Sequence, residues 1–297
     1  MRIVSLLPAA TEIVAALGSA KSLVGVTHEC DWPPEVRALP RVTASAGTEG
    51  SGAPDDQLLA FARACAPVFA LDTAKIKELE PDLILAQAHS DASPVSDSAL
   101  RALAAEIATP PRIVTLNGKS LKGVLEDIQL VGEALGSKNA RSLTKVLTES
   151  RRVVHEHLKA TQTHRPRVAV IEWINPLHVA GRWVPEMMHA AGGVDALATV
   201  GQKSPMVTID EVRAGTPDII IIAPCGCDAR RAELEAMDLL AKPEWEWAST
   251  CAVWSVDAHA YFSRPGPRLW DGIQLIAEIL HPPLFQAPRT TDARRLR

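Results

Sequence analysis

The stretch that decides the fold is a long central segment without helix-breaking residues. Residues 139–164, NARSLTKVLTESRRVVHEHLKATQTH, contain neither glycine nor proline. The apolar residues of this segment recur at helical spacing: Leu143, Val146, Leu147, Val153, Val154 and Leu158. The pattern predicts one amphipathic helix of more than about 20 residues, roughly 35 Å long.

Both sides of this helix carry the alternation of short apolar runs and helical stretches that is typical of α/β proteins. Strands are predicted before it at 3–7, 23–26, 68–71, 83–86 and 113–116, and after it at 168–171, 219–223 and 253–256. A closing helix is predicted over 269–280. We therefore expect an α/β fold in which two similar lobes with parallel sheets are joined by one long backbone helix, with a ligand cleft between the lobes.

The expected organisation has three parts. Residues 1–120 form an N-terminal α/β lobe, residues 121–164 are linking helices that include the long backbone helix, and residues 165–297 form a C-terminal α/β lobe. The last stretch, 287–297, is polar and basic, and we expect it to fray.

Composition and charge exclude several classes of protein. The chain has 297 residues, 47% of them hydrophobic and 22% charged, which is ordinary for a globular protein of about two domains. A net charge of −4 is not that of a nucleic-acid binder. No apolar run is long enough to cross a bilayer, and the first residues are typical of a strand rather than a secretory signal. A cytoplasmic protein is therefore expected, whereas a processed form would be periplasmic or a lipoprotein.

Rings, histidines and polar groups gather directly after the predicted strands. In open parallel sheets, ligands bind beyond the carboxyl ends of the strands. The side chains at these positions are Pro8, His28, Trp32, His89, Glu172, Trp173, His178, Cys225, His259 and Tyr261. Tryptophan is in surplus, with seven residues against four Phe and one Tyr. Trp32, Trp173 and Trp183 lie where a flat ligand could be held, and the other four tryptophans fit core packing.

The same positions leave two other functions open. His28, His89, His178 and Glu172 could hold a metal ion or a metal chelate such as haem or an iron siderophore. The plain alternative is that these histidines are hydrogen-bonded loop residues. An enzyme could instead use Glu172 as acid or base, because burial would raise the pKa of its carboxyl, with Cys225 as nucleophile.

Several motifs carry a resemblance to a known family. They are RIVSLLPAATE at 2–12, VGVT at 24–27, DWPP at 31–34, EWINPL at 172–177, GRWVPE at 181–186, AGG at 191–193, PD at 217–218 and YFSRPGPR at 261–268. In order and over almost the whole chain, they resemble the substrate-binding proteins of cobalamin and iron-chelate ABC importers, in the helical-backbone metal receptor superfamily. The resemblance implies two Rossmann-like lobes held by a single backbone helix.

The resemblance also implies a ligand and the residues that contact it. The ligand is a corrinoid such as cobalamin, bound without catalysis and without a required cofactor, and haem or an iron chelate is the alternative. The matched positions are Pro8 and Ala9 in the loop that borders the corrinoid, Trp32, His178 and Tyr261 as positions that line the ligand, and Arg264 as a cleft arginine. Together with His28, His89, Trp173 and Trp183, they make the expected ligand-binding set.

Docking on a membrane permease is the last expectation from the resemblance. Importer proteins of this kind present one glutamate per lobe to the permease. The matched positions here are Ala74 and Asp210. We therefore expect ligand binding without firm docking on an ABC permease.

Overall fold

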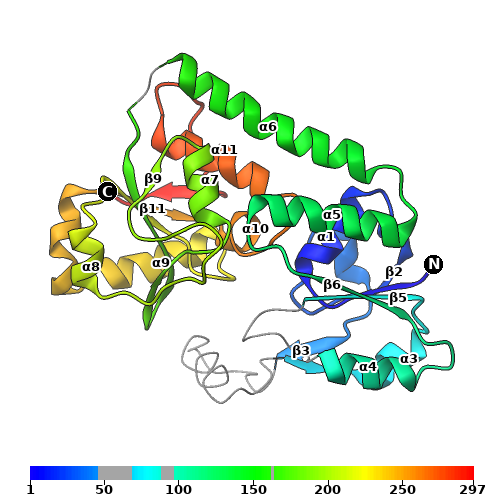
Figure 1. Cartoon of the computed structure of the whole chain (residues 1–297). Coiled ribbons are helices and arrows are strands. Elements are labelled where there is room, and N and C mark those ends of the chain that lie inside the picture. Colours follow the sequence, from blue (N-terminus) through cyan, green and yellow to red (C-terminus); the bar gives the residue numbers. More distant parts are fainter. Residues whose placement is uncertain (46–68, 88–96, 162–163) are drawn as a thin grey trace. The chain divides into compact units, whose positions relative to one another are not determined.

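The computed structural model describes residues 1–45, 69–87, 97–161 and 164–297, and Figure 1 labels its helices and strands. The chain forms two compact units. Unit 1 consists of Met1–Gly118 and Gly123–Thr144, and unit 2 consists of Lys119–Lys122 and Lys145–Arg297. Two consecutive helices, α5 (Leu121–Leu135) and α6 (Ala140–Ala160), contribute residues to both units.

The predicted central helix is confirmed as α6, which has 21 residues. Its buried side is narrower than expected. Leu147, Val154 and Leu158 are buried, whereas Val146 and Val153 are 63% and 55% exposed. The sequence predicts too wide an apolar face, because only one stripe of the helix is buried. The residues of this stripe lie seven and four positions apart.

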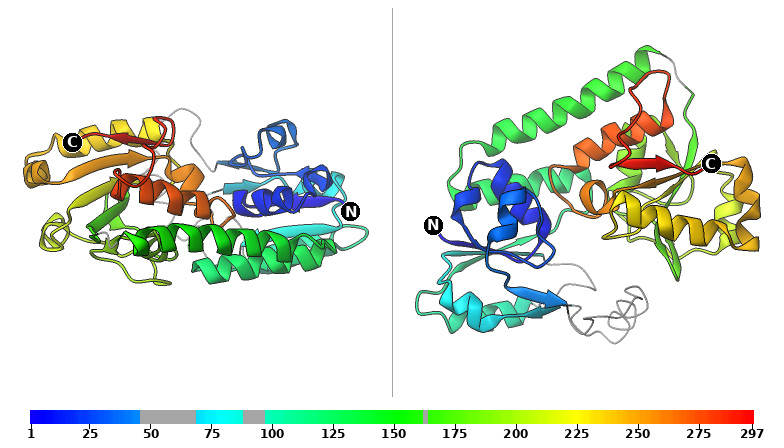
Figure 2. Two further views of the ribbon diagram at one scale, coloured as in Figure 1. Left: turned by 90° about the horizontal axis from the view of Figure 1, so that it is seen from above. Right: turned by 180° about the vertical axis from the view of Figure 1, so that it is seen from behind.

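Within unit 1, α5 and the start of α6 pack closely side by side (Figure 2). Gln129 Nε2 donates a 2.8 Å hydrogen bond to Thr144 Oγ1. Gly132 lies against Ala140 so closely that a Cβ on the glycine would be 2.4 Å from the Ala140 Cβ. Any larger residue at position 132 would therefore push the two helices apart.

The sheet of unit 1 is entirely parallel, with the strand order β2-β1-β5-β6. Its strands are β1 (Ile3–Ser5), β2 (Leu23–Gly25), β5 (Leu83–Gln87) and β6 (Arg112–Leu116). An antiparallel pair, β3 (Thr43–Ser45) and β4 (Phe69–Leu71), stands apart from it. The helices are α1 (Pro8–Ala16), α3 (Thr73–Glu78) and α4 (Asp97–Ala105), with short 3-10 turns η1 (Ala20–Ser22) and η2 (Pro34–Ala38).

The sheet of unit 2 is mixed rather than purely parallel, which corrects the sequence expectation. Its order is β12-β11-β10-β7-β8, and β9 pairs with β7. The strands are β7 (Arg167–Ile174), β8 (Leu177–Val179), β9 (Val194–Asp195), β10 (Ile219–Ile222), β11 (Ala252–Val256) and β12 (Ala293–Arg295). Strands β7, β10 and β11 are parallel, and β8 and β12 are antiparallel edge strands.

The C-terminal residues were expected to fray, and this expectation is wrong. Strand β12 pairs with β11 in the register Trp254↔Arg295 and Val256↔Ala293. Backbone pairing with β11 holds this segment, and basic side chains add to it, as in the 2.9 Å bond from Arg294 Nη1 to Glu233 Oε2. Both partners lie far away in the sequence, so the composition of the segment gave no sign of order. The helices of the unit are α7 (Val184–Ala190), α8 (Ile209–Ala214), α9 (Ala229–Leu240), α10 (Ala258–Tyr261), α11 (Leu269–Leu280) and the 3-10 segment η3 (Pro243–Thr250).

The two units repeat one structural detail. In unit 1, the backbone N–H of Arg2 donates to Asp82 Oδ2 at 2.6 Å, and Arg2 Nε donates to a carbonyl of the preceding turn. In unit 2, Arg167 makes the same two bonds, to Asp218 Oδ2 at 2.8 Å and to the turn before it. The residue two before each aspartate, Glu80 or Thr216, has a positive φ. This arginine–aspartate clamp joins two neighbouring parallel strands at their amino ends, β1 and β5 in unit 1 and β7 and β10 in unit 2.

Candidate functional site

In unit 2, the carboxyl ends of three adjacent parallel strands meet at one edge of the sheet. Cys225, after β10, donates its backbone N–H to Glu172 O of β7 at 3.1 Å. His259, after β11, donates its backbone N–H to Cys227 O at 3.0 Å. The structure thus brings together Glu172, Cys225 and His259, which the sequence placed after separate strands.

Glu172 is the most constrained polar group at this edge. The pairing register of β7 and β8 shifts between Ile171 and Trp173, so Glu172 is an extra residue, as in a β-bulge. Ser204 Oγ lies 3.0 and 2.9 Å from the two carboxylate oxygens and donates to them. Burial raises the pKa of the Glu172 carboxyl, because desolvation disfavours the charged form, while the Ser204 hydrogen bond and the charge of Arg182 oppose the rise.

Ser204 was missed by the sequence reasoning, and it joins Glu172 to a loop that crosses the end of β8. The Gly181 N–H donates to Ser204 Oγ at 3.2 Å. A Cβ on Gly181 would lie 2.6 Å from Ser204 N, so only glycine allows this approach. Arg182, the next residue, has φ 54° and donates its N–H to Gln202 O at 2.6 Å. Nothing in the local sequence around Ser204 signals a contact with a residue 32 positions away.

His178 lies on β8 with its ring orientation and tautomer fixed. Its Nδ1 is 2.9 Å from Pro176 O. A carbonyl oxygen only accepts, so Nδ1 carries a proton, and in the neutral form of the ring the lone pair lies on Nε2. A neutral imidazole whose other nitrogen is held by a backbone carbonyl is the form in which histidine binds cobalt or iron.

Three predicted aromatic residues of unit 2 have different environments. Trp173 and Tyr261 are half-buried, and the Trp173 indole N–H donates to Asn175 O at 3.0 Å. Burial raises the pKa of the Tyr261 hydroxyl, which remains neutral at ordinary pH. Trp183 is only 6% exposed, and its indole N–H donates to Phe262 O at 2.7 Å. Its role as a ligand contact stays a prediction, and its observed contact ties α7 to the end of α10.

Arg264 is a buried cation, 5% exposed, at the same edge. Its guanidinium contacts the ring of His259, with Nη2 3.3 Å from Nδ1. An arginine only donates, so the histidine ring nitrogen is the acceptor in this contact. Asp257 caps α10 by accepting from the Ala260 N–H at 2.7 Å, and burial raises the pKa of this carboxyl.

In unit 1, the carboxyl ends of β1 and β2 are neighbours in the sheet and carry four predicted residues. Pro8 and Ala9 begin α1 directly after β1, and Pro8 takes the first helical turn because it needs no N–H partner there. His28 and Trp32 follow β2, and the Trp32 side chain is 47% exposed.

The loop that carries His28 is held by residues that the sequence did not single out. Thr43 Oγ1 accepts from the His28 backbone N–H at 3.0 Å and is 2.7 Å from His28 Nδ1. Arg41 Nη1 donates to Thr27 O at 2.9 Å and to Cys30 O at 2.8 Å. Burial lowers the pKa of His28, Glu29 counteracts this and Arg41 adds to it, so the ring is neutral at pH 7.

The alternative metal set, His28, His89, His178 and Glu172, draws on both units and on a residue outside the described ranges, so it stays a prediction. His89 lies outside the described residues. His28 belongs to unit 1, whereas Glu172 and His178 belong to unit 2. In the described part of the chain, no group of three or more His, Cys, Asp and Glu side chains could hold a metal ion.

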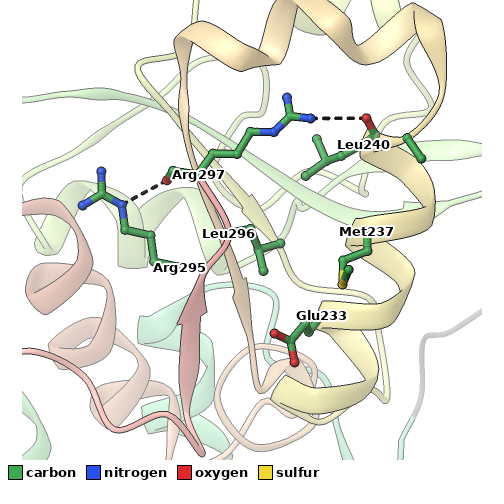
Figure 3. Close-up of a pocket in the computed structure, with 7 residues that line it drawn as sticks. Glu233, Met237, Leu240, Arg295, Leu296 and Arg297 are labelled. Carbon is green, nitrogen blue, oxygen red and sulfur yellow. Dashed lines mark hydrogen bonds between the residues drawn. The ribbon is translucent and has the colours of Figure 1, made fainter.

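A separate depression of about 430 Å³ lies between α9 and β12 (Figure 3). Its lining is Glu233, Met237, Leu240, Ala241, Arg295, Leu296 and Arg297. Arg297 O accepts from the Val253 N–H near the amino end of β11, which is the opposite edge of the sheet from Glu172. This depression is therefore distinct from the strand-end site.

Comparisons with known proteins agree with the fold and the motifs. The family described as "Periplasmic binding protein" matches residues 3–253. The chain is 25% identical over 295 residues to an uncharacterized ABC transporter substrate-binding lipoprotein of Bacillus subtilis, covering 96% of this chain and 81% of the relative. It is 25% identical over 290 residues to a vitamin B12-binding protein of Vibrio cholerae, covering 94% of this chain and 88% of the relative.

Solved structures show the same fold at lower identity. A periplasmic heme-binding protein from Pseudomonas aeruginosa matches with a TM-score of 0.75 and 20% identity, over 99% of this chain and 97% of that one. The periplasmic vitamin B12-binding protein of Vibrio cholerae matches with a TM-score of 0.63 and 22% identity, over 94% and 96%. Lipoprotein and periplasmic relatives do not support the expected cytoplasmic location. No helix among the described residues has the length and apolar character needed to span a membrane.

Proposed function

The chain belongs to the periplasmic binding protein family, and on that premise we propose that it binds a large, flat, metal-centred macrocycle, in the first place a corrinoid. It is a substrate-binding protein of the ABC-importer type. The relatives named for vitamin B12 support a corrinoid as the ligand. The proposed role is binding, and it includes no catalytic step.

The observation that carries the proposal is the fixed ring of His178, which pairs with Trp173 near the carboxyl end of β7 in unit 2. Its Nδ1–H is held by Pro176 O, so Nε2 is prepared to coordinate the axial position of a metal-centred ring. Trp173 and Tyr261 are half-buried, so each leaves part of its ring for an apolar macrocycle. Arg264 and His259 supply polar groups for the ring's substituents.

Haem is the second candidate, because the same imidazole suits iron as well as cobalt. Haem carries two carboxylates, whereas the arms of cobalamin are amides. A cationic Arg264 would therefore favour haem on charge, and the curated relatives favour the corrinoid. The two ligands differ in visible absorption, so one experiment separates them.

The test is a titration of purified protein with aquocobalamin, cyanocobalamin and haemin, followed by tryptophan fluorescence and absorption spectra. We expect quenching and saturation with one class of ligand, and weaker binding by His178→Ala. Aquocobalamin should bind more tightly than cyanocobalamin if His178 replaces its exchangeable water. Absence of quenching and of thermal stabilisation with all three ligands at millimolar concentration would overturn the proposal.

An ABC permease is the proposed partner, at the surface of a membrane. Asp210 and Ala74 are exposed second residues of α8 and α3, the equivalent helices of the two units. A carboxylate on only one unit gives an asymmetric docking surface. Restoring the missing charge with Ala74→Glu should strengthen binding to a cognate permease in liposomes, and unchanged binding would argue against docking through these positions.

A further inference from the structure

The strand that carries His178 has an unusual amount of support for an edge strand of three residues. On one side, β8 pairs with β7 in the register Ile174↔Leu177 and Trp173↔His178. On the other side, Val179 N–H donates to Pro205 O at 3.2 Å and Val207 N–H donates to Leu177 O at 2.9 Å. His178 itself forms an isolated bridge with Met206.

The segment 205–207 that covers β8 is in turn anchored by Ser204. Ser204 Oγ accepts the Gly181 N–H from the chain leaving β8 and donates to Glu172 of β7. The three groups close a loop of contacts around the end of β8: Glu172 to Ser204, Ser204 to Gly181, and β8 back to β7. Within this loop of contacts, Glu172 is the residue that lies on β7, an inner strand of the sheet.

The placement of Glu172 in a register shift explains how it reaches Ser204. An extra residue in one strand turns its side chain away from the regular alternation and is typical of positions that aim a functional group. A largely buried carboxylate costs stability unless it is hydrogen-bonded. A residue that served packing alone would more readily be apolar at this position.

We propose that Glu172 is a positioning residue that, through Ser204 and the 205–207 segment, fixes β8 and with it the imidazole of His178. The inference rests on the proposed function in one respect: a fixed imidazole matters for binding because the proposed ligand is coordinated through its metal. The chain of contacts from Glu172 through Ser204 and residues 205–207 to β8 is called the strap below. It is present without ligand and can be tested without one. It assigns Glu172 neither a catalytic role nor direct metal ligation.

The first experiment uses the ligand-free protein and measures amide hydrogen exchange. Glu172→Ala and Ser204→Ala each remove one end of the strap, so the Val179 and Val207 amides should exchange at least about tenfold faster, because their hydrogen bonds open locally. Glu172→Gln keeps an oxygen that accepts from Ser204 and should exchange like wild type. Core amides of β10 should be unchanged in all variants.

The matched control is Asp195→Ala. Asp195 is another largely buried carboxylate of unit 2, which accepts from the Leu197 and Ala198 N–H groups at 2.9 and 2.7 Å. It pairs with the amino end of β7, at Val168, and not with β8. This variant should destabilise the unit without faster exchange at Val179. Wild-type exchange at Val179 and Val207 in Ser204→Ala would overturn the proposal, even if Glu172→Ala does not fold.

The second experiment measures haemin binding and the spectrum of the bound iron. Loss of a group that orients a metal ligand typically weakens binding about 10–100-fold. Glu172→Ala and Ser204→Ala should bind haemin this much more weakly, with a smaller fraction of histidine-ligated iron, and both quantities should approach those of His178→Ala. Glu172→Gln should restore the affinity and the ligated fraction. Haemin binding by Glu172→Ala with a wild-type spectrum would count against the positioning role. Failure of wild-type protein to bind haemin or aquocobalamin would overturn the proposed function, and the exchange data would still decide on the strap.

Discussion

Glu186 Oε2 accepts a 2.8 Å hydrogen bond from the backbone N–H of Leu121, the first residue of α5. The other carboxylate oxygen, Oε1, accepts from Arg151 Nη1 of α6 at 3.0 Å. One carboxylate on the first turn of α7 therefore bonds to both α5 and α6, through residues of these helices that belong to unit 2.

Replacing Glu186 by Ala should destabilise unit 2 by about 1–3 kcal/mol, because an N–H at a helix start and a guanidinium lose their partner. Urea unfolding followed by tryptophan fluorescence measures the change. Arg152→Ala is the control on α6, since Arg152 pairs only with exposed Glu149 and Glu156 and its loss should change little. Equal stability of Glu186→Ala and Arg152→Ala would contradict the prediction.

Gly181→Ala should cost about 1–3 kcal/mol, because the added methyl group would overlap backbone atoms of Gln202 and Ser204 that cannot move aside cheaply. Thermal unfolding measures the loss. Gly215→Ala is the matched control, since its nearest atom would be 3.2 Å away and its φ of −64° suits alanine. A smaller loss of stability in Gly181→Ala than in Gly215→Ala would contradict the prediction, because it would show that residues 202–204 move aside easily.

Acid should weaken unit 2 through His281. The His281 side chain is 3% exposed, and burial lowers its pKa below the ordinary value of 6.5. Hydrogen bonds to the Ala191 and Gly192 backbone oppose this shift, and the charges of Arg165 and His164 add to it. The folded state binds this proton less readily than the unfolded state, so stability is full above about pH 6.5 and falls as the pH drops below it. His281→Gln should remove part of this pH dependence. Parallel stability curves of the two proteins between pH 7.5 and 5 would refute the role of His281.

The cysteines should differ sharply in reactivity toward an aromatic disulfide reagent. Cys225 is exposed and Cys227 is partly exposed, whereas Cys30 and Cys251 are buried. Among the four cysteines in the described part of the chain, we expect Cys225 to react fastest, so that its fast phase is lost in Cys225→Ser and persists in Cys251→Ser. Bound ligand at the strand ends should slow this phase, and a ligand that left it unchanged would have to bind elsewhere.

The sequence predicts the strands and helices whose apolar pattern is local. The run Ile219–Ile222 and the helix Leu269–Leu280 are found at or within one residue of the predicted positions. Strands β8, β9 and β12 were not predicted, because two or three residues show no periodic pattern. β8 forms a hairpin with β7, and β9 and β12 exist because β7 and β11, more distant in the sequence, supply their hydrogen bonds.

The residues of the candidate site likewise fall into those that the sequence could predict and those that it could not. Residues near or after the carboxyl end of a predicted strand, such as Glu172 and Cys225, could be assigned to that edge of the sheet from the order of strands alone, although β7 continues through Glu172 to Ile174. Ser204, Thr43 and Arg41 could not, because each acts on a loop far away in the sequence and none belongs to a motif. The tautomer of His178 depends on a backbone carbonyl two residues away, and only the fold shows which nitrogen that carbonyl faces.

The repeated clamp of Arg2 with Asp82 and of Arg167 with Asp218 bears on ancestry. Two units that share a backbone-to-carboxylate bond, an arginine anchor and a positive φ at the same offset are what a tandem duplication of one half-length gene leaves behind. The clamps are alike in the two units while the residues at the strand ends differ, so folding and the choice of ligand depend on different parts of each unit.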